Sequence, residues 1–154
     1  MESDEPGFPD AAPARRGLGV QLQWVEVRNP NDLDRAFATM VRQRAGALLV
    51  LPDPLFTFHR QRIVDLAAKH RLPAMYGQRE WVEAGGLAAY AADPTELARQ
   101  AAAIVDRVLK GAAPGDLPVE PPGKFDFIVN LKTAKALSLK PHESVLQHAD
   151  ELVE

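Results

Sequence analysis

The chain has 154 residues, about one domain, with 46% hydrophobic residues, 25% charged residues and a formal net charge of −3. This composition is ordinary for a soluble globular protein, and the negative charge argues against a nucleic-acid-binding protein, which usually carries a basic face. No apolar run approaches the roughly 18 residues of a membrane span, and the absence of cysteine excludes disulfides and zinc-thiolate sites.

The first residues do not resemble a folded element. Residues 1–13 are acidic and rich in Pro and Ala, which indicates disorder, and residues 14–19 are compatible with the last turn of a helix. The segment lacks the basic and apolar regions of a signal peptide, so we expect the chain, as encoded, to remain in the cytoplasm.

A strand and a helix are predicted next. Residues 21–27, QLQWVEV, are partly alternating and partly continuous in apolar character, which favours a strand. Asn29 is a candidate N-cap and Pro30 the first residue of a helix with one apolar stripe, which ends before Gly46.

Residues 45–77 carry the clearest pattern, a strand, a helix and a second strand. The wholly apolar run 47–51 is typical of a strand buried on both faces of a parallel sheet. The helix is predicted to run to about residue 70, with Asp53 as N-cap and Pro54 as first residue. Residues 73–76 complete a parallel βαβ unit with a right-handed crossover.

Ligands of open α/β sheets bind at the carboxyl ends of the strands. The residues that follow these two strands are therefore the predicted ligand site: Pro52, Asp53, Pro54, Tyr76, Gly77, Gln78, Arg79 and Glu80.

The rest of the chain predicts further elements. A loop or short helical turn over 78–86 precedes a small strand over 87–90. Asp93 and Glu96 then begin a helix that ends at Gly111. A linker rich in Pro and Gly follows, and then come a strand over 125–130, a short helix over 131–138 and a terminal helix over 141–152. The order indicates a parallel-sheet α/β sandwich without its opening strand.

Three segments carry a resemblance to a known family: LLVLPDPLF, LPAMYGQREWVEAGG and KFDFIVNLKTAKALSLKPHESVLQHADELVE. They are similar to signature blocks of the ABC-transporter substrate-binding protein family, the branch with a type I periplasmic-binding-protein fold. The last block is the most specific, because its Asn-Leu-Lys-Thr-Ala-Lys order continues into an Ala-Asp-Glu ending. The resemblance covers nearly all of the chain beyond residue 16, and corresponds to the C-terminal half of the family.

The resemblance implies two α/β lobes that hold a solute in the cleft between them, of which this chain supplies one. It implies a disordered or degenerate segment over 1–16, a ligand-binding lobe over 17–116, and a crossover linker and tail over 117–154 that pack on a first lobe. It further implies a non-catalytic function, a small amino-acid-like solute as ligand, an ABC transporter permease as partner, and a periplasmic location for full-length members.

Each site residue has a functional and a structural interpretation. Asp53 aligns with an acidic position that lines the family's cleft, and is also a helix cap. Tyr76 could stack on a ligand, or be partly buried at a strand end, and Gly77 permits close approach of the backbone. Arg79 and Glu80 could bind the carboxylate and the amine of an amino acid, or be solvated charges.

Other chemistry is weakly indicated. The four histidines, His59, His70, His142 and His148, do not have metal-ligand spacing. The basic residues Arg60, Arg62, Lys69 and Arg71 favour a solvated face. No phosphate loop, nucleophile elbow or carboxylate pair is evident, so we expect neither an enzyme nor a cofactor.

Two alternatives to a solute-binding lobe are left open. One is a degenerate fragment that acts only as an oligomeric or interaction unit, with homodimerisation through the apolar C-terminal tail. The other is a receiver-like signalling domain with Asp53 as phospho-acceptor, although the acidic pair and the lysine of such a site are missing from the required positions.

Overall fold

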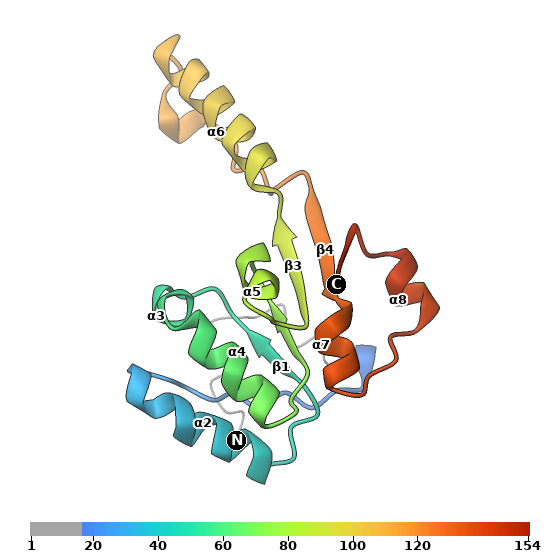
Figure 1. Ribbon diagram of the computed structural model, residues 1–154. Coiled ribbons are helices and arrows are strands. Elements are labelled where there is room, and N and C mark those ends of the chain that lie inside the picture. The colour runs from blue at the N-terminus through green and yellow to red at the C-terminus, as the bar shows by residue number, and fades with distance from the viewer. Residues whose placement is uncertain (1–16) are drawn as a thin grey trace.

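A five-stranded sheet in the order β1-β2-β3-β4-β5 organises the computed structural model, which describes residues 17–154 (Figure 1). β1, β2 and β3 are parallel, β4 is antiparallel to β3, and β5 is parallel to β4. The strands are β1 Leu48–Val50, β2 Ala74–Tyr76, β3 Ala88–Ala92, β4 Phe125–Asn130 and β5 Glu151–Val153. The predicted α/β class is confirmed.

The predicted helix starts are present because each has a side-chain cap. The carboxylate or amide oxygens of Asn29, Asp53 and Asp93 accept hydrogen bonds from the backbone N–H of the second residue of their helices, and Asp93 also from the third. The helical elements are η1 Pro30–Asp32, α2 Leu33–Arg42, α3 Pro54–Phe58, α4 Arg60–Lys69, α5 Arg79–Glu83, α6 Pro94–Leu109, η2 Pro114–Asp116, α7 Leu131–Ala136 and α8 Glu143–Gln147. None of the helices within residues 17–154 is long and apolar enough to cross a bilayer.

The core lies on one face of the sheet. A cross-strand row of side chains, Val50, Tyr76, Ala89 and Ile128, is buried against apolar residues of α2, α4 and α5. Leu33, Phe37 and Met40 supply the buried stripe of α2, and Ile63, Val64, Leu66 and Ala67 that of α4. This arrangement follows from the helical spacing of those residues.

The opposite face of the sheet is less covered. It carries a second cross-strand row, Leu49, Met75, Ala88, Val129 and Leu152. Leu49 is 61% exposed and Leu152 is 44% exposed. The prediction that residues 47–51 form a strand buried on both faces is therefore wrong, because β1 is an edge strand with only one face against the core.

Two other element predictions are wrong. Residues 21–27 form no strand, since they pair with no strand of residues 17–154, and within this segment Val25 and Val27 pack against the core. Residues 141–152 do not form one helix. α8 ends near His148, and the backbone N–H and carboxylate of Asp150 then bond to the carbonyl and N–H of Phe127, which aligns β5 with β4.

The helix expected from Asp53 to about residue 70 is present in two pieces. His59 has φ −101° and ψ 21° and separates α3 from α4. At the N-terminus, Gly17 and Leu18 are helical, in keeping with a helix end near residue 19, whereas the expectation of disorder over 1–13 lies outside the described residues.

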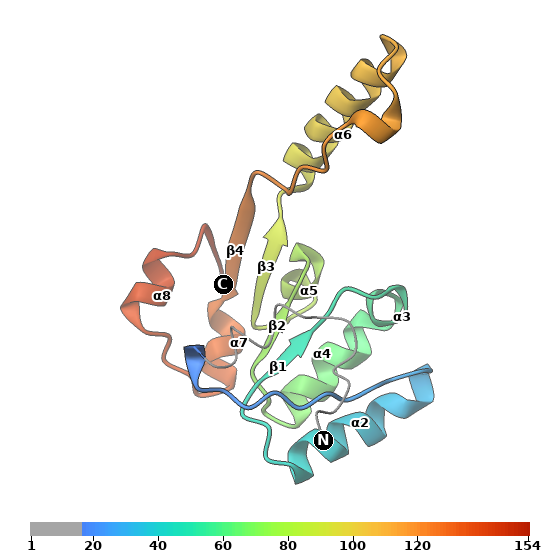
Figure 2. The same ribbon diagram turned by 180° about the vertical axis from the view of Figure 1, so that it is seen from behind.

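α6 forms an arm that projects away from the sheet in both views (Figures 1 and 2). None of its residues is buried. The chain returns along the arm to β4, whose beginning is joined to the end of β3 by the hydrogen bond from Asp93 N–H to the Lys124 carbonyl. Residues 125–153 thus complete the same sheet, while packing of the tail over 117–154 on a first lobe stays a prediction.

Candidate functional site

The predicted site residues lie along one edge of the sheet. The carboxyl ends of β1, β2 and β3 meet there, and the amino ends of β4 and β5 share the edge because these two strands run the other way. α6 leaves the body at the end of β3, from this same edge (Figure 1). The edge therefore has both the loops in which α/β sheets bind ligands and the projecting arm.

The two predicted loops touch one another. A Cβ atom placed on Gly77 would lie 3.0 Å from Cγ of Pro52, so a side chain at position 77 would press on the loop after β1. Asp53 accepts a hydrogen bond of 2.8 Å from the Leu55 N–H and caps α3, of which Pro54 is the first residue. Its capping role is confirmed, while its role toward a ligand stays a prediction.

Tyr76 lies inside the core. Its side chain is 1% exposed, and its ring stacks on that of Trp81 with centroids 4.6 Å apart. Burial raises the pKa of the Tyr76 hydroxyl well above its usual range. Gln78 follows and accepts a hydrogen bond from the Trp81 indole N–H at 3.3 Å. Both side chains thus support α5, and ligand stacking on Tyr76 would require its ring to leave the core.

Arg79 has a partner in the last strand. Its guanidinium forms a two-pronged ion pair with the carboxylate of Glu151, one contact being 3.0 Å from Nη1 to Oε1. The hydrogen bond from Arg79 holds the pKa of Glu151 below its usual range, and the same bond raises the pKa of Arg79. Arg79 is therefore already paired with a carboxylate of this chain, and it fastens α5 to β5.

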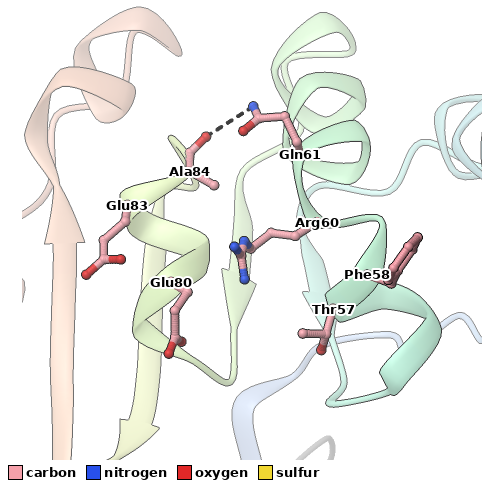
Figure 3. Close-up of a pocket in the computed structure, with 7 residues that line it drawn as sticks. All are labelled: Thr57, Phe58, Arg60, Gln61, Glu80, Glu83 and Ala84. Carbon is pink, nitrogen blue, oxygen red and sulfur yellow. Dashed lines mark hydrogen bonds between the residues drawn. The ribbon is translucent and has the colours of Figure 1, made fainter.

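A hollow of about 360 Å³ lies between α5 and the α3–α4 junction (Figure 3). Gln61 spans it near one end, where its side-chain N–H donates to the Ala84 carbonyl at 3.4 Å. Of the predicted site residues, only Glu80 lines it. The other lining residues are Thr57, Phe58, Arg60, Gln61, Glu83 and Ala84.

From the sequence, Arg60 is predicted to lie with Arg62, Lys69 and Arg71 on a solvated face of its helix. Its guanidinium instead extends toward α5, while Phe58 points the other way (Figure 3). The sequence does not predict the break at His59, which makes Arg60 the first residue of α4. Within residues 17–154, no cluster of three His, Asp or Glu side chains is arranged to hold a metal ion.

The sequence comparison decides the family. A family model described as ABC transporter substrate binding protein matches residues 14–153, nearly the whole chain. The chain belongs to this family. The resemblance found in the three sequence blocks is thereby confirmed.

One curated relative of this family member is a tyrosine-binding protein of Clostridioides difficile (strain R20291). It is 25% identical over 114 residues, which cover 74% of this chain and 33% of the relative.

Solved structures give the same fold. An ABC domain from Streptococcus pneumoniae in complex with L-Trp has a TM-score of 0.79 and 25% identity, over 90% of this chain and 48% of that one. A conserved domain protein from Vibrio cholerae has a TM-score of 0.81 and 21% identity, over 92% and 47%. This chain spans about half the length of these structures and a third of the curated relative.

Proposed function

We propose that this chain is one lobe of a non-catalytic binding protein for an amino-acid-like solute, with the edge formed by Pro52–Pro54 and Gly77–Glu80 as one wall of the cleft. The observation that carries the proposal is the likeness to the L-Trp-bound pneumococcal structure, which extends over 90% of this chain. The tyrosine-binding relative supports the same solute class. An ABC transporter permease is the partner that this proposal implies, and a periplasmic location goes with it.

The carboxylate of Asp53 is the predicted contact for a polar group of the solute. Asp53→Ala should weaken binding by about 1–3 kcal/mol if that contact is made. The measurement is calorimetry with L-tryptophan and L-tyrosine, on a chimera in which the first half of the pneumococcal relative is joined to this chain.

Asp53→Asn is the matched control, because asparagine caps a helix about as well as aspartate but carries no charge. Weaker binding by both variants would show that the negative charge of Asp53 contacts the ligand. If only Asp53→Ala binds more weakly, and it is also less stable, Asp53 acts as a helix cap and not as a ligand contact.

The lobe by itself should bind such solutes only weakly. A two-lobed cleft buries most of its ligand between both halves, so a single wall supplies part of the contacts while the entropic cost of association remains. Millimolar amino acids should therefore leave the melting temperature of the 154-residue chain nearly unchanged. A large saturable shift would show a self-sufficient binding domain instead, and no binding even in the chimera would favour the degenerate-fragment alternative.

Self-association through the C-terminal tail is a further proposal. β4 and β5 pair within the sheet, yet Phe125, Leu139, Val145 and Leu152 stay about 40% exposed, at 40%, 38%, 40% and 44%. Exposed apolar side chains favour association when they are contiguous. Light scattering should detect a dimer or larger species that Leu152→Lys reduces to a monomer. A monodisperse wild-type monomer would contradict this proposal.

A further inference from the structure

Arg60 differs from most arginines of residues 17–154 in that its side chain has no partner among these residues. Its side chain forms no ion pair and no hydrogen bond with any residue from 17 to 154, although it is only partly exposed. Arg44 and Arg107 also make no such contact, but both are exposed on the surface. Other arginines are paired within the fold: Arg28, Arg35, Arg62, Arg79 and Arg99 with carboxylates, and Arg71 with Ser138.

The position of Arg60 suggests what could bind its unpaired guanidinium. Its guanidinium extends into the hollow between α4 and α5, where five N–H donors face space that the protein does not fill (Figure 3). A guanidinium in such a setting favours a planar carboxylate, which it can bind through two parallel hydrogen bonds.

Glu80 provides the opposite charge in the same hollow. It stands on α5, across from Arg60, and its carboxylate too has no ion pair or hydrogen bond with a described residue. Glu83 lines the hollow as well, but its carboxylate points to the other side of α5, away from Arg60 (Figure 3). One free cation, on α4, and one free carboxylate, on α5, therefore line the same hollow.

We infer that Arg60 binds the α-carboxylate of the solute and that Glu80 binds its α-ammonium group. The inference rests on the proposed function, and it assigns the carboxylate to Arg60 in place of Arg79, whose guanidinium is occupied by Glu151. A zwitterion matches the two charges of the hollow, and the volume of about 360 Å³ lies in the lower part of the roughly 300–1,000 Å³ range of small-molecule sites.

The Thr57 hydroxyl and Gln61 complete the site. Thr57 donates its hydroxyl hydrogen to the Asp53 carbonyl at 3.0 Å, so its oxygen keeps acceptor capacity toward the hollow. Gln61 bonds to Asp65 within α4, which orients its side chain, and to the Ala84 carbonyl, which joins α4 to the end of α5 near one end of the hollow. The Thr57 and Gln61 side chains are thus held in place by bonds within the protein before a ligand binds.

The test is a titration of the isotope-labelled 154-residue chain, followed by NMR, which detects millimolar affinities that a melting experiment does not. Three probes separate the two charges: L-tryptophan, indole-3-propionate, which lacks the ammonium group, and tryptamine, which lacks the carboxylate. L-tryptophan and indole-3-propionate should shift the side-chain Nε–H signal of Arg60, and tryptamine should not.

Variants sharpen the assignment. Arg60→Gln should weaken binding of L-tryptophan and of indole-3-propionate by about tenfold or more, the loss of one charged hydrogen-bonded contact. Glu80→Gln should weaken binding of L-tryptophan but not of indole-3-propionate. Arg107→Gln is the control, because Arg107 is an exposed, unpaired arginine on α6, far along the chain from the hollow.

The outcomes are distinct for the two proposals. If L-tryptophan shifts the backbone amides of residues 53, 55, 77 and 78 but leaves the Arg60 signal unshifted, and Arg60→Gln binds as tightly as the wild type, the proposed function stands and the assignment to Arg60 is wrong. If no probe shifts any signal, the inference is overturned for this chain. Binding by the chimera would then still support the proposed function, and absence of binding there would overturn it too.

Discussion

Tyr76→Ala is expected to lower the free energy of unfolding by about 3–5 kcal/mol, the usual cost of emptying an aromatic site in a core. The Tyr76 side chain is 1% exposed at the centre of the cross-strand row and packs against the Trp81 ring. Its loss would leave a cavity between the sheet and α5. Urea denaturation followed by circular dichroism gives the free energy, provided that the slope with denaturant is unchanged.

Tyr76→Phe is the matched control, because it keeps the ring and removes only the hydroxyl. That hydroxyl makes no hydrogen bond to another residue from 17 to 154, so its removal should change stability by less than about 1 kcal/mol. If Tyr76 acts only in packing, the Phe variant should also bind L-tryptophan in the chimera as the wild type does. Weaker binding at unchanged stability would show that the Tyr76 hydroxyl contributes to ligand binding.

The parts of the fold that the sequence predicts well are those encoded locally. Asn29, Asp53 and Asp93 each combine a capping side chain with a following proline, and all three begin helices in the structure. The predicted bounds of β4, residues 125–130, are those observed. Each of these patterns is complete within a few residues, so no knowledge of distant contacts is needed to interpret it.

The wrong predictions concern contacts made at long range. Residues 151–153 form a strand because β4 has a free edge beside them and Asp150 bonds to Phe127, more than twenty residues away. Leu49 is exposed because it lies on the less covered face of the sheet, in the edge strand β1. An apolar run indicates burial, but only the completed sheet determines whether one face or both are covered.

In the candidate site, too, the sequence predicts local features well and long-range contacts poorly. The sequence correctly brings the loop after β1 and the loop after β2 to one edge, where Pro52 and Gly77 meet. It fails on side-chain partners, since Glu151 was expected in a helix and could not be recognised as the partner of Arg79. Consequently Arg79 appeared free and Arg60 appeared solvated, whereas in the structure Arg79 is paired and Arg60 faces the hollow.

Gly86→Ala should also be strongly destabilising. A Cβ atom at this position would lie 2.6 Å from Cε2 of Tyr76 and 2.7 Å from the Trp81 carbonyl oxygen, both far inside van der Waals contact. The Tyr76 ring is held by stacking, and the carbonyl belongs to the backbone and accepts the Gly86 N–H at 2.8 Å. Neither neighbour can move freely, so we expect a loss of about 2–3 kcal/mol, in the range of overpacked cores.

Gly46→Ala is the control for this prediction, because nothing lies within 4 Å of a Cβ atom at position 46. It should leave stability unchanged or raise it by a few tenths of a kcal/mol, since alanine restricts the unfolded chain more than glycine does.

A double-mutant cycle tests the cause of the strain at position 86. In a Tyr76→Ala background the clash with the ring is gone and only the Trp81 carbonyl still opposes the new methyl group, so Gly86→Ala should cost less there than in the wild type. Equal costs in both backgrounds would show that the Tyr76 ring moves aside without penalty and that the backbone contact alone requires glycine.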